Sequence, residues 1–168
     1  MRAEVYKAFR FPPFEDERNK AWQRAMEGCN SVGIHFRKRK DYCSNAAYKG
    51  ICEVDYYQKA IEIMRQKVDN PKFFMFTDNP QWVAENIKGV DYQLVDTNPI
   101  VGRGLHLDMQ LMACCRHNII ANSTYSWWGA YLNPNPEKTV IAPVQWLSRK
   151  LFGDSVREKH LAKGWMGI

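Results

Sequence analysis

Short apolar segments alternate with segments of helical pattern along most of the chain, and this alternation limits the fold more than any other feature. The apolar segments have the composition of buried strands, and they occupy residues 31–36, 72–77, 92–96, 117–121 and 139–142. Helical patterns precede or separate them at residues 15–27, 53–68, 80–87, 108–115 and 125–132. Helices between successive short strands are typical of a parallel sheet covered on both faces. The sequence therefore predicts an α/β fold, a Rossmann-like parallel sheet flanked by helices.

The length and composition fit one domain. The chain has 168 residues, of which 45% are apolar and 25% charged, and this is the profile of a globular domain with a hydrophobic core. No apolar run approaches the roughly 20 residues that span a bilayer, and the first residues lack the pattern of a signal peptide. We therefore expect a single domain over residues 1–168 and a cytoplasmic location.

The cysteines and histidines do not form a metal-binding pattern. Cys114 and Cys115 are adjacent, the five cysteines include no Cys-x-x-Cys pair, and the four histidines are scattered. This arrangement suits neither a disulfide framework nor a zinc site. We expect free thiols, no bound metal and no cofactor.

The charge of the chain is unevenly distributed. The formal net charge is +6, residues 37–40 are four consecutive cations, and a second basic stretch lies between residues 149 and 163. Such a balance favours anionic partners, which include phosphates, nucleic acid and an acidic membrane surface. Peripheral association with a membrane is one of the interpretations that the charge leaves open.

The first basic run follows directly on a predicted buried strand. Because side chains alternate along a strand, His35, Arg37 and Arg39 are expected on one side. Guanidinium groups match phosphate oxygens bidentately, so these residues would form a pyrophosphate clamp at a strand end, where ligands of parallel sheets bind. The alternative is a solvated basic loop.

A second candidate segment is rich in hydroxyl groups. Ser123, Thr124 and Ser126 lie where a predicted strand leads into a helix. The unpaired N–H groups of a helix start, together with such hydroxyls, form an anion site. The alternative is an ordinary helix cap, which needs only one of these residues.

Two aspartates are candidates for ligand contacts. Asp108 lies at a predicted helix start, and its carboxylate could accept two hydrogen bonds from the N1–H and N2–H₂ edge of guanine. The alternative is an acidic residue that favours the helix dipole. Asp78 allows the same two interpretations, a binding residue or a cap for the helix that begins near Pro80.

These segments resemble α-1,2-fucosyltransferases of glycosyltransferase family eleven. The resemblance lies in HFRK and DY within residues 35–42, FFMFTDN at 73–79, DMQLM at 108–112 and HNIIANSTYSWWGA at 117–130. It extends from about residue 5 to about residue 148. The last block is long and specific.

The resemblance implies a GT-B architecture of two Rossmann-like domains, of which this chain corresponds to the C-terminal, donor-binding half. The glycine-rich N-terminal half, which shapes the acceptor side, is absent from the sequence. The implied reaction is metal-independent, inverting transfer of fucose from GDP-fucose to the 2-hydroxyl of a terminal galactose on a glycan. The implied partners are therefore GDP-fucose and a galactose-terminated acceptor.

The resemblance also implies roles for individual residues. Arg37 would hold the β-phosphate, His35 would line the donor pocket, and Asp108 would recognise guanine. The segment around Ser123 and Thr124 would meet the phosphates. The basic segment is one residue longer than the family motif and has lysine in place of its second arginine, so Arg37 and Arg39 both remain candidates for the main phosphate contact.

The predicted catalytic residues are Arg37 and Asp41. Negative charge grows on the departing GDP during fucosyl transfer, and a cation such as Arg37, supported by Arg39, would stabilise it. Asp41 is a candidate general base for the acceptor hydroxyl. A weakly basic catalyst, or a base in the absent half, is the alternative.

Two other classes of function remain as alternatives. The first is a non-catalytic nucleotide-sugar-binding module, which a truncated fucosyltransferase would be. The second is a basic RNA-binding domain. The aromatic residues disfavour it, because they stand at core spacings and do not interleave with the basic run.

Overall fold

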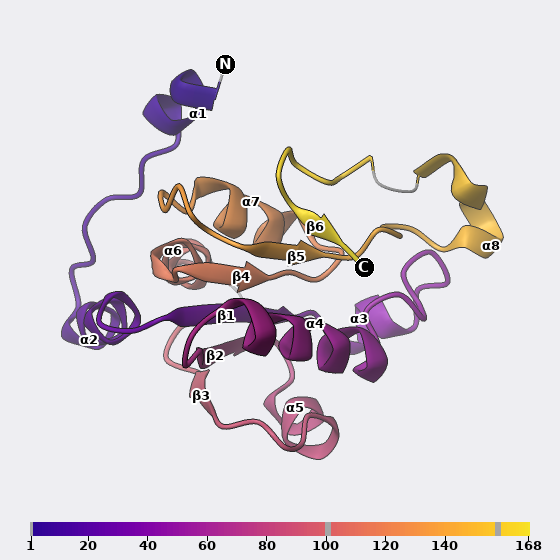
Figure 1. The fold of residues 1–168 in the computed structure, drawn as a ribbon, viewed down its shortest axis with the longest axis horizontal. Coiled ribbons are helices and arrows are strands. Elements are labelled where there is room, and N and C mark those ends of the chain that lie inside the picture. Colours follow the sequence, from indigo (N-terminus) through magenta and orange to yellow (C-terminus); the bar gives the residue numbers. More distant parts are fainter. Residues whose placement is uncertain (1, 100–101, 157–158) are drawn as a thin grey trace.

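A parallel sheet of six strands forms the centre of the fold (Figure 1). The computed structural model describes residues 2–99, 102–156 and 159–168. The strands are β1 (Ser31–Phe36), β2 (Lys72–Thr77), β3 (Tyr92–Val95), β4 (His117–Ile119), β5 (Val140–Ala142) and β6 (Met166–Gly167). Their order is β3-β2-β1-β4-β5-β6, and all neighbours pair in parallel. The predicted Rossmann-like α/β class is confirmed, and β6 is an addition to the five strands expected.

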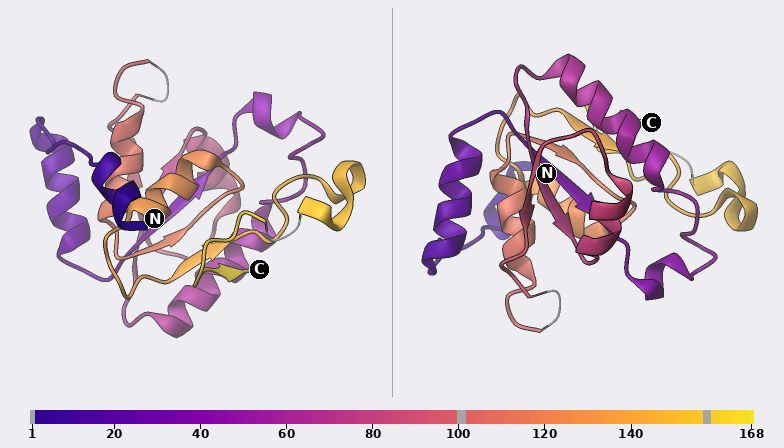
Figure 2. Two further views of the ribbon diagram at one scale, coloured as in Figure 1. Left: turned by 90° about the horizontal axis from the view of Figure 1, so that it is seen from above. Right: turned by 90° about the horizontal axis from the view of Figure 1, so that it is seen from below.

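Helices cover both faces of the sheet (Figure 2). They are α1 (Arg2–Ala8), α2 (Glu17–Glu27), α3 (Lys40–Cys43), α4 (Val54–Lys67), α5 (Pro80–Asn86), α6 (His106–Cys114), α7 (Thr124–Leu132) and α8 (Arg149–Phe152), followed by the 3-10 turn η1 (Gly153–Val156). Helices α4 and α5 pack on one face, whereas α2 and α6 pack on the other beside α7. The sequence pattern does not indicate the short elements α1, α3 and α8.

Alternation along the central strands builds both halves of the core. Ile34 and Phe36 of β1 point toward α4, where they meet Tyr57, whose ring centre lies 4.2 Å from that of Phe36. Phe74 and Phe76 of β2 point to the opposite face and pack with Leu111 of α6. Strands that are buried on both sides are mostly apolar, which is why β1 and β2 read as nearly continuous apolar runs.

The strand order creates a binding crevice at one point of the sheet. From β1 the chain moves to β2 and β3 on one side, and it then crosses back to place β4 on the other side of β1. The connections that leave β1 and β4 therefore diverge, and a crevice opens between the carboxyl ends of these two strands. The sheet topology thus places a site after Phe36 and Ile119.

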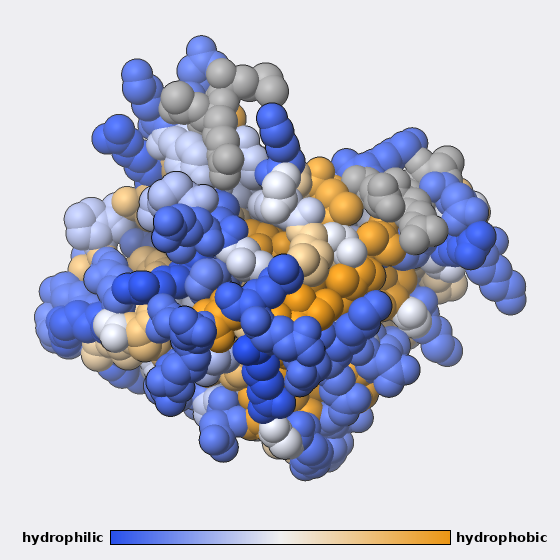
Figure 3. Space-filling model, viewed as in Figure 1, coloured by the Kyte–Doolittle hydropathy of each residue, from blue (hydrophilic) through white to orange (hydrophobic). Residues whose placement is uncertain are grey.

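The surface facing the viewer in Figure 1 is largely hydrophilic, with a band of hydrophobic residues across its middle (Figure 3). Within the part of the chain that the structure describes, no helix combines the length and the apolar character needed to traverse a bilayer.

Candidate functional site

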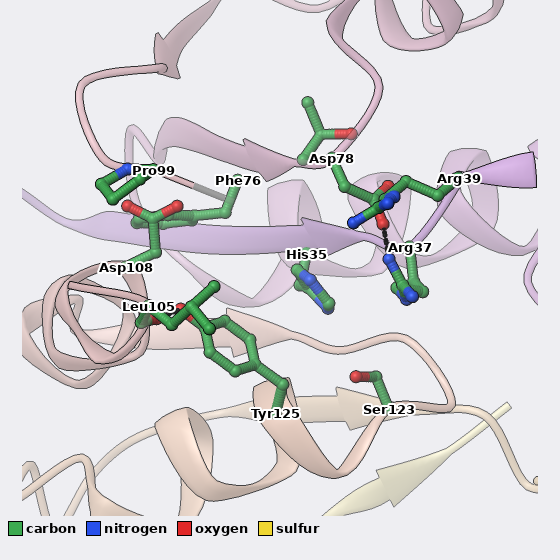
Figure 4. Close-up of a pocket in the computed structure, with 11 residues that line it drawn as sticks. His35, Arg37, Arg39, Phe76, Asp78, Pro99, Leu105, Asp108, Ser123 and Tyr125 are labelled. Atoms are coloured by element: carbon green, nitrogen blue, oxygen red, sulfur yellow. Dashed lines mark hydrogen bonds and ion pairs between the residues drawn. The ribbon is translucent and has the colours of Figure 1, made fainter. Parts of the chain in front are cut away.

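A cavity of about 280 Å³ occupies the crevice between β1 and β4 (Figure 4). It is lined by residues from the ends of β1 and β2, from the segment before α6, from α6 and from the start of α7. These residues are His35, Arg37, Arg39, Phe76, Thr77, Asp78, Pro99, Leu105, Asp108, Ser123 and Tyr125. The basic run, the hydroxyl-rich segment and Asp108 therefore share one cavity.

The basic run that follows β1 has side chains on two sides, one facing the cavity and one facing away from it. His35, Arg37 and Arg39 line the cavity, as the alternation predicts. Lys38 points the other way and is nearly fully buried; its Nζ lies 3.0 Å from Glu53 Oε2 and 4.3 Å from the centre of the Trp82 ring. Lys38 is therefore a structural residue.

Two carboxylates hold the Arg37 guanidinium. One amino group donates to Asp78, and the other lies 2.9 Å from Asp41 Oδ2. Asp78 is fixed in turn, because its Oδ1 accepts the Lys38 backbone N–H at 2.6 Å. Asp41, in α3, is not among the residues that line the cavity, and its Oδ1 lies 3.8 Å from Arg39 Nε. The structure thus gives Asp41 contacts with both arginines, and its role as a base stays a prediction.

Of the two interpretations of Asp78, the one in which it caps the following helix is wrong. The N-cap of α5 is Asn79, whose side chain accepts the Trp82 N–H at 3.1 Å. Asp78 faces the cavity because its two oxygens bind Arg37 and the Lys38 amide, both of which belong to the end of β1. These long-range partners outcompete a local cap.

His35 is a neutral ring in the wall of the cavity. Burial, with a smaller contribution from the Arg37 charge, lowers the pKa of His35 to about 3. Its Nδ1 has no hydrogen-bond partner within the described residues. The imidazole lies 5.6 Å from the Tyr125 ring, measured between centres. A ring in this position can donate or accept a hydrogen bond but does not add positive charge at neutral pH.

The low pKa of His35 makes stability depend on pH. Between pH 6.5 and 3 the unfolded chain binds a proton at this ring that the folded chain does not, so acid favours unfolding. We expect this ring to lower the free energy of unfolding by about 1 kcal/mol as the pH falls from 6.5 to 5.5. Urea unfolding at both pH values should show a smaller loss in the free energy of unfolding for His35→Asn than for the wild type. The two proteins have the same other histidines, so the difference between them reports on His35. Equal losses would contradict a neutral His35.

Only one of the three hydroxyl residues faces the cavity. Ser123 lines it and is the N-cap residue of α7, although its side chain makes no capping hydrogen bond. Thr124 is exposed and does not line the cavity. Ser126 is fully buried, and its Oγ lies 3.3 Å from the Ser123 carbonyl and 3.5 Å from the Ala121 carbonyl. Ser126 therefore stabilises the turn that leads into α7 through hydrogen bonds to the backbone of that turn.

Tyr125 is a cavity residue that the sequence analysis did not single out. Its hydroxyl donates to the Leu105 carbonyl and accepts the Met109 N–H at 2.9 Å. Tyr125 thereby links the start of α7 to the start of α6, which carries Asp108. Its place inside the hydroxyl-rich segment, one residue after Thr124, was the only available signal.

Asp108 lies in the first turn of α6 and is partly buried in the cavity wall. Burial raises the pKa of Asp108, whereas a hydrogen bond from Asn98 opposes this rise. Asn98 Nδ2 lies 2.7 Å from Asp108 Oδ1. The second carboxylate oxygen, Oδ2, accepts no hydrogen bond that has been identified between described residues.

The part of the chain that the structure describes contains no cluster of metal ligands. Across residues 2–99, 102–156 and 159–168, no three side chains of His, Cys, Asp or Glu lie close enough together to hold a metal ion. All the cysteines are free thiols, with Cys52 and Cys115 buried.

Comparisons with known proteins agree with this architecture. The family model described as Glycosyl transferase family 11 matches residues 18–168. The O-antigen biosynthesis glycosyltransferase WbnK of Escherichia coli is 34% identical over 147 residues, which cover 84% of this chain and 46% of that protein. An alpha-1,2-colitosyltransferase of Escherichia coli is 37% identical over 124 residues, 72% of this chain and 42% of the relative. The galactoside alpha-(1,2)-fucosyltransferase 2 of Rattus norvegicus is 27% identical over 140 residues, 79% of this chain and 39% of the relative.

Fold and comparisons together define a Rossmann-like α/β domain of the glycosyltransferase class. More narrowly, the chain belongs to glycosyltransferase family 11, as the resemblance in its sequence indicates. It spans less than half the length of the relatives named above.

Proposed function

We propose that this chain binds GDP-fucose and presents it for inverting transfer of fucose to the 2-hydroxyl of a terminal galactose. The observation that carries the proposal is the meeting of Arg37, Ser123 and Asp108 in one cavity at the topological switch point. These residues offer a cation, a helix start and a carboxylate, which suit a diphosphate and a guanine base. The name of the rat relative, a galactoside alpha-(1,2)-fucosyltransferase, supports transfer of fucose to a galactoside.

The diphosphate would bind between Arg37 and the start of α7. Asp78 and Asp41 fix the guanidinium before a ligand arrives, so little side-chain entropy is lost on binding. On the other side, the Ser123 hydroxyl and the first amides of α7 are available, because the Ser123 side chain makes no capping hydrogen bond. The neutral His35 adds a hydrogen-bonding group without a charge.

The same groups would stabilise the departing GDP. In the transition state, negative charge moves onto the β-phosphate, and fixed donors aimed at that charge lower the barrier. We assign this role to Arg37, with Arg39 and the α7 amides in support and without a metal ion or other cofactor. Asp41 does not line the cavity, and its two oxygens lie next to Arg37 and Arg39. Orienting Arg37 is therefore the role that the geometry favours for Asp41.

A non-catalytic nucleotide-sugar-binding module is the second candidate, since the chain spans less than half of its relatives' length. An assay of fucose transfer to galactosides separates the two. Turnover by the 168-residue chain would establish an enzyme, and GDP-fucose binding without turnover would favour the module. Binding of RNA is disfavoured because Lys38 is buried against Glu53, and because Arg37 and Arg39 line a small cavity instead of an open basic surface.

Recognition of guanine is tested by calorimetric titration with GDP, ADP and UDP. We expect GDP to bind most tightly and Asp108→Asn to reduce its affinity roughly 10- to 100-fold, because a carboxylate accepts both guanine donors whereas an amide accepts only one. Affinities for ADP and UDP should change little. Asp55→Asn, an exposed aspartate in the first turn of α4, is the matched control. Equal affinities of the wild type for the three nucleotides would argue against Asp108 as the guanine-recognising residue.

A further inference from the structure

The Asp108 carboxylate lies at the end of a chain of hydrogen bonds that begins outside the cavity. At the start of α2, Asp16 Oδ1 accepts the Asn19 backbone N–H at 2.8 Å, and Asp16 Oδ2 accepts Asn19 Nδ2 at 2.8 Å. The amides of Asn19 and Asn98 then bind each other reciprocally, with both N–O distances at 2.9 Å. Asn98 Nδ2 completes the chain at Asp108 Oδ1, 2.7 Å away.

Within this series of hydrogen bonds, every side-chain amide proton of Asn19 and Asn98 has a defined acceptor. Asn19 Nδ2 donates to Asp16 and Asn98, and Asn98 Nδ2 donates to Asn19 and Asp108. This pattern determines the orientation of both amides, because the opposite orientation of Asn98 would place its carbonyl oxygen against the Asp108 carboxylate. Asn19 is only 3% exposed and Asn98 is partly buried, so water has limited access to the bonds between the two amides.

We propose that Asn98, held by Asn19, is a positioning residue that fixes the Asp108 carboxylate for recognition of guanine. This inference rests on the proposed function. Two donors of guanine must meet two carboxylate oxygens at once, which requires a defined orientation of the carboxylate plane. Asn98 restrains Oδ1 from one side and leaves Oδ2 and the remaining lone pair of Oδ1 for the base. Asn98 itself need not touch the ligand.

The test is a double-mutant cycle that combines Asn98→Ala with Asp108→Asn and uses GDP and ADP as probes. In the otherwise native chain, Asn98→Ala should reduce the preference for GDP over ADP roughly three- to tenfold, the scale of one hydrogen bond. In the Asp108→Asn background, Asn98→Ala should not change this preference further, because a residue that acts only through the Asp108 carboxylate has no influence once that carboxylate is removed. Asn98→Ser repeats the measurement if the alanine variant does not fold.

The pH profile gives a second, independent readout. The Asn98 hydrogen bond opposes the rise in the pKa of Asp108. Without this bond the carboxylate should protonate at higher pH, so GDP affinity should be lost at higher pH in Asn98→Ala than in the wild type. Asn86→Ala, which removes a side-chain amide bonded to the Trp82 carbonyl in α5, should change neither readout.

The outcomes separate the inference from the proposed function. A wild-type chain that binds GDP and ADP equally would overturn guanine recognition and the role of Asn98 together. If Asp108→Asn abolishes the preference but Asn98→Ala preserves it, only the inference is wrong. Equal losses of GDP and ADP affinity in Asn98→Ala, or effects that add in the double variant, would show a merely structural role and overturn the inference as well.

Discussion

Replacing Arg37 with alanine is expected to weaken GDP binding by about 1.5–3 kcal/mol, or roughly 10- to 150-fold, which is the scale of a hydrogen bond to a charged group. The loss should be large because this guanidinium faces the cavity in a fixed position. Asp78 and Asp41 hold its two amino groups, and in the variant both carboxylates lose the cation, while Asp78, which lines the cavity, faces the diphosphate directly. Calorimetric titration with GDP measures the effect.

Three companion variants make the Arg37 experiment specific. Arg37→Lys keeps the charge but removes the planar donor pair, so we expect it to recover only part of the affinity. Arg39→Ala should cost less than Arg37→Ala, since a single contact identified among the described residues, 3.8 Å to Asp41, holds Arg39. Arg24→Ala in α2 changes a well-exposed arginine outside the cavity and serves as the control. A change of less than threefold in Arg37→Ala would contradict its assignment as the phosphate-binding residue.

Replacing Asn133 with leucine is expected to lower the free energy of unfolding by about 2–4 kcal/mol, because each buried acceptor that loses its donor costs about 1–3 kcal/mol. Asn133 is 1% exposed, and its Nδ2 lies 2.6 Å from the Cys115 carbonyl and 2.9 Å from Asn118 Oδ1. Asn118 in turn donates to the Met112 carbonyl at 2.9 Å. This network joins α6, β4 and the end of α7, so it supports the two helices that carry Asp108 and Ser123.

Denaturant unfolding followed by circular dichroism tests the Asn133 prediction. Asn135→Ala is the matched control, because Asn135 is less buried and its side chain donates to the Arg116 carbonyl near the surface. We expect the control to cost less than about 1 kcal/mol. Similar losses in the two variants would show that burial of the Asn133 network contributes little.

Much of the fold was predictable from local pattern. The bounds of β1 and β2 agree with the predicted strands residue for residue, because each is an apolar run between polar residues and is buried on both faces. Strand β6 was not predictable, since two residues carry no periodic signal. It forms because β5 offers an unpaired edge to which Met166 and Gly167 pair.

The candidate site was predictable to the extent that it depends on alternation. His35, Arg37 and Arg39 share a side because a strand has a period of two, so their common direction is a property of the chain itself. The burial of Ser126 and the exposure of Thr124 were not predictable. They depend on how the start of α7 is rotated against β4, which packing against neighbouring elements decides.

The sequence by itself determined the alternation of strands and helices, the family, and the residue types that meet at the end of β1 and the start of α7. These features depend on neighbours in the chain, and neighbours suffice to define a periodicity or a motif. The tertiary structure decided that Asp78 holds Arg37 and that Asn19 and Asn98 connect α2 to Asp108. Such partners lie up to 79 positions apart, and only tertiary structure brings them together, through the pairing of β1 with β2 and the packing of α2 against α6.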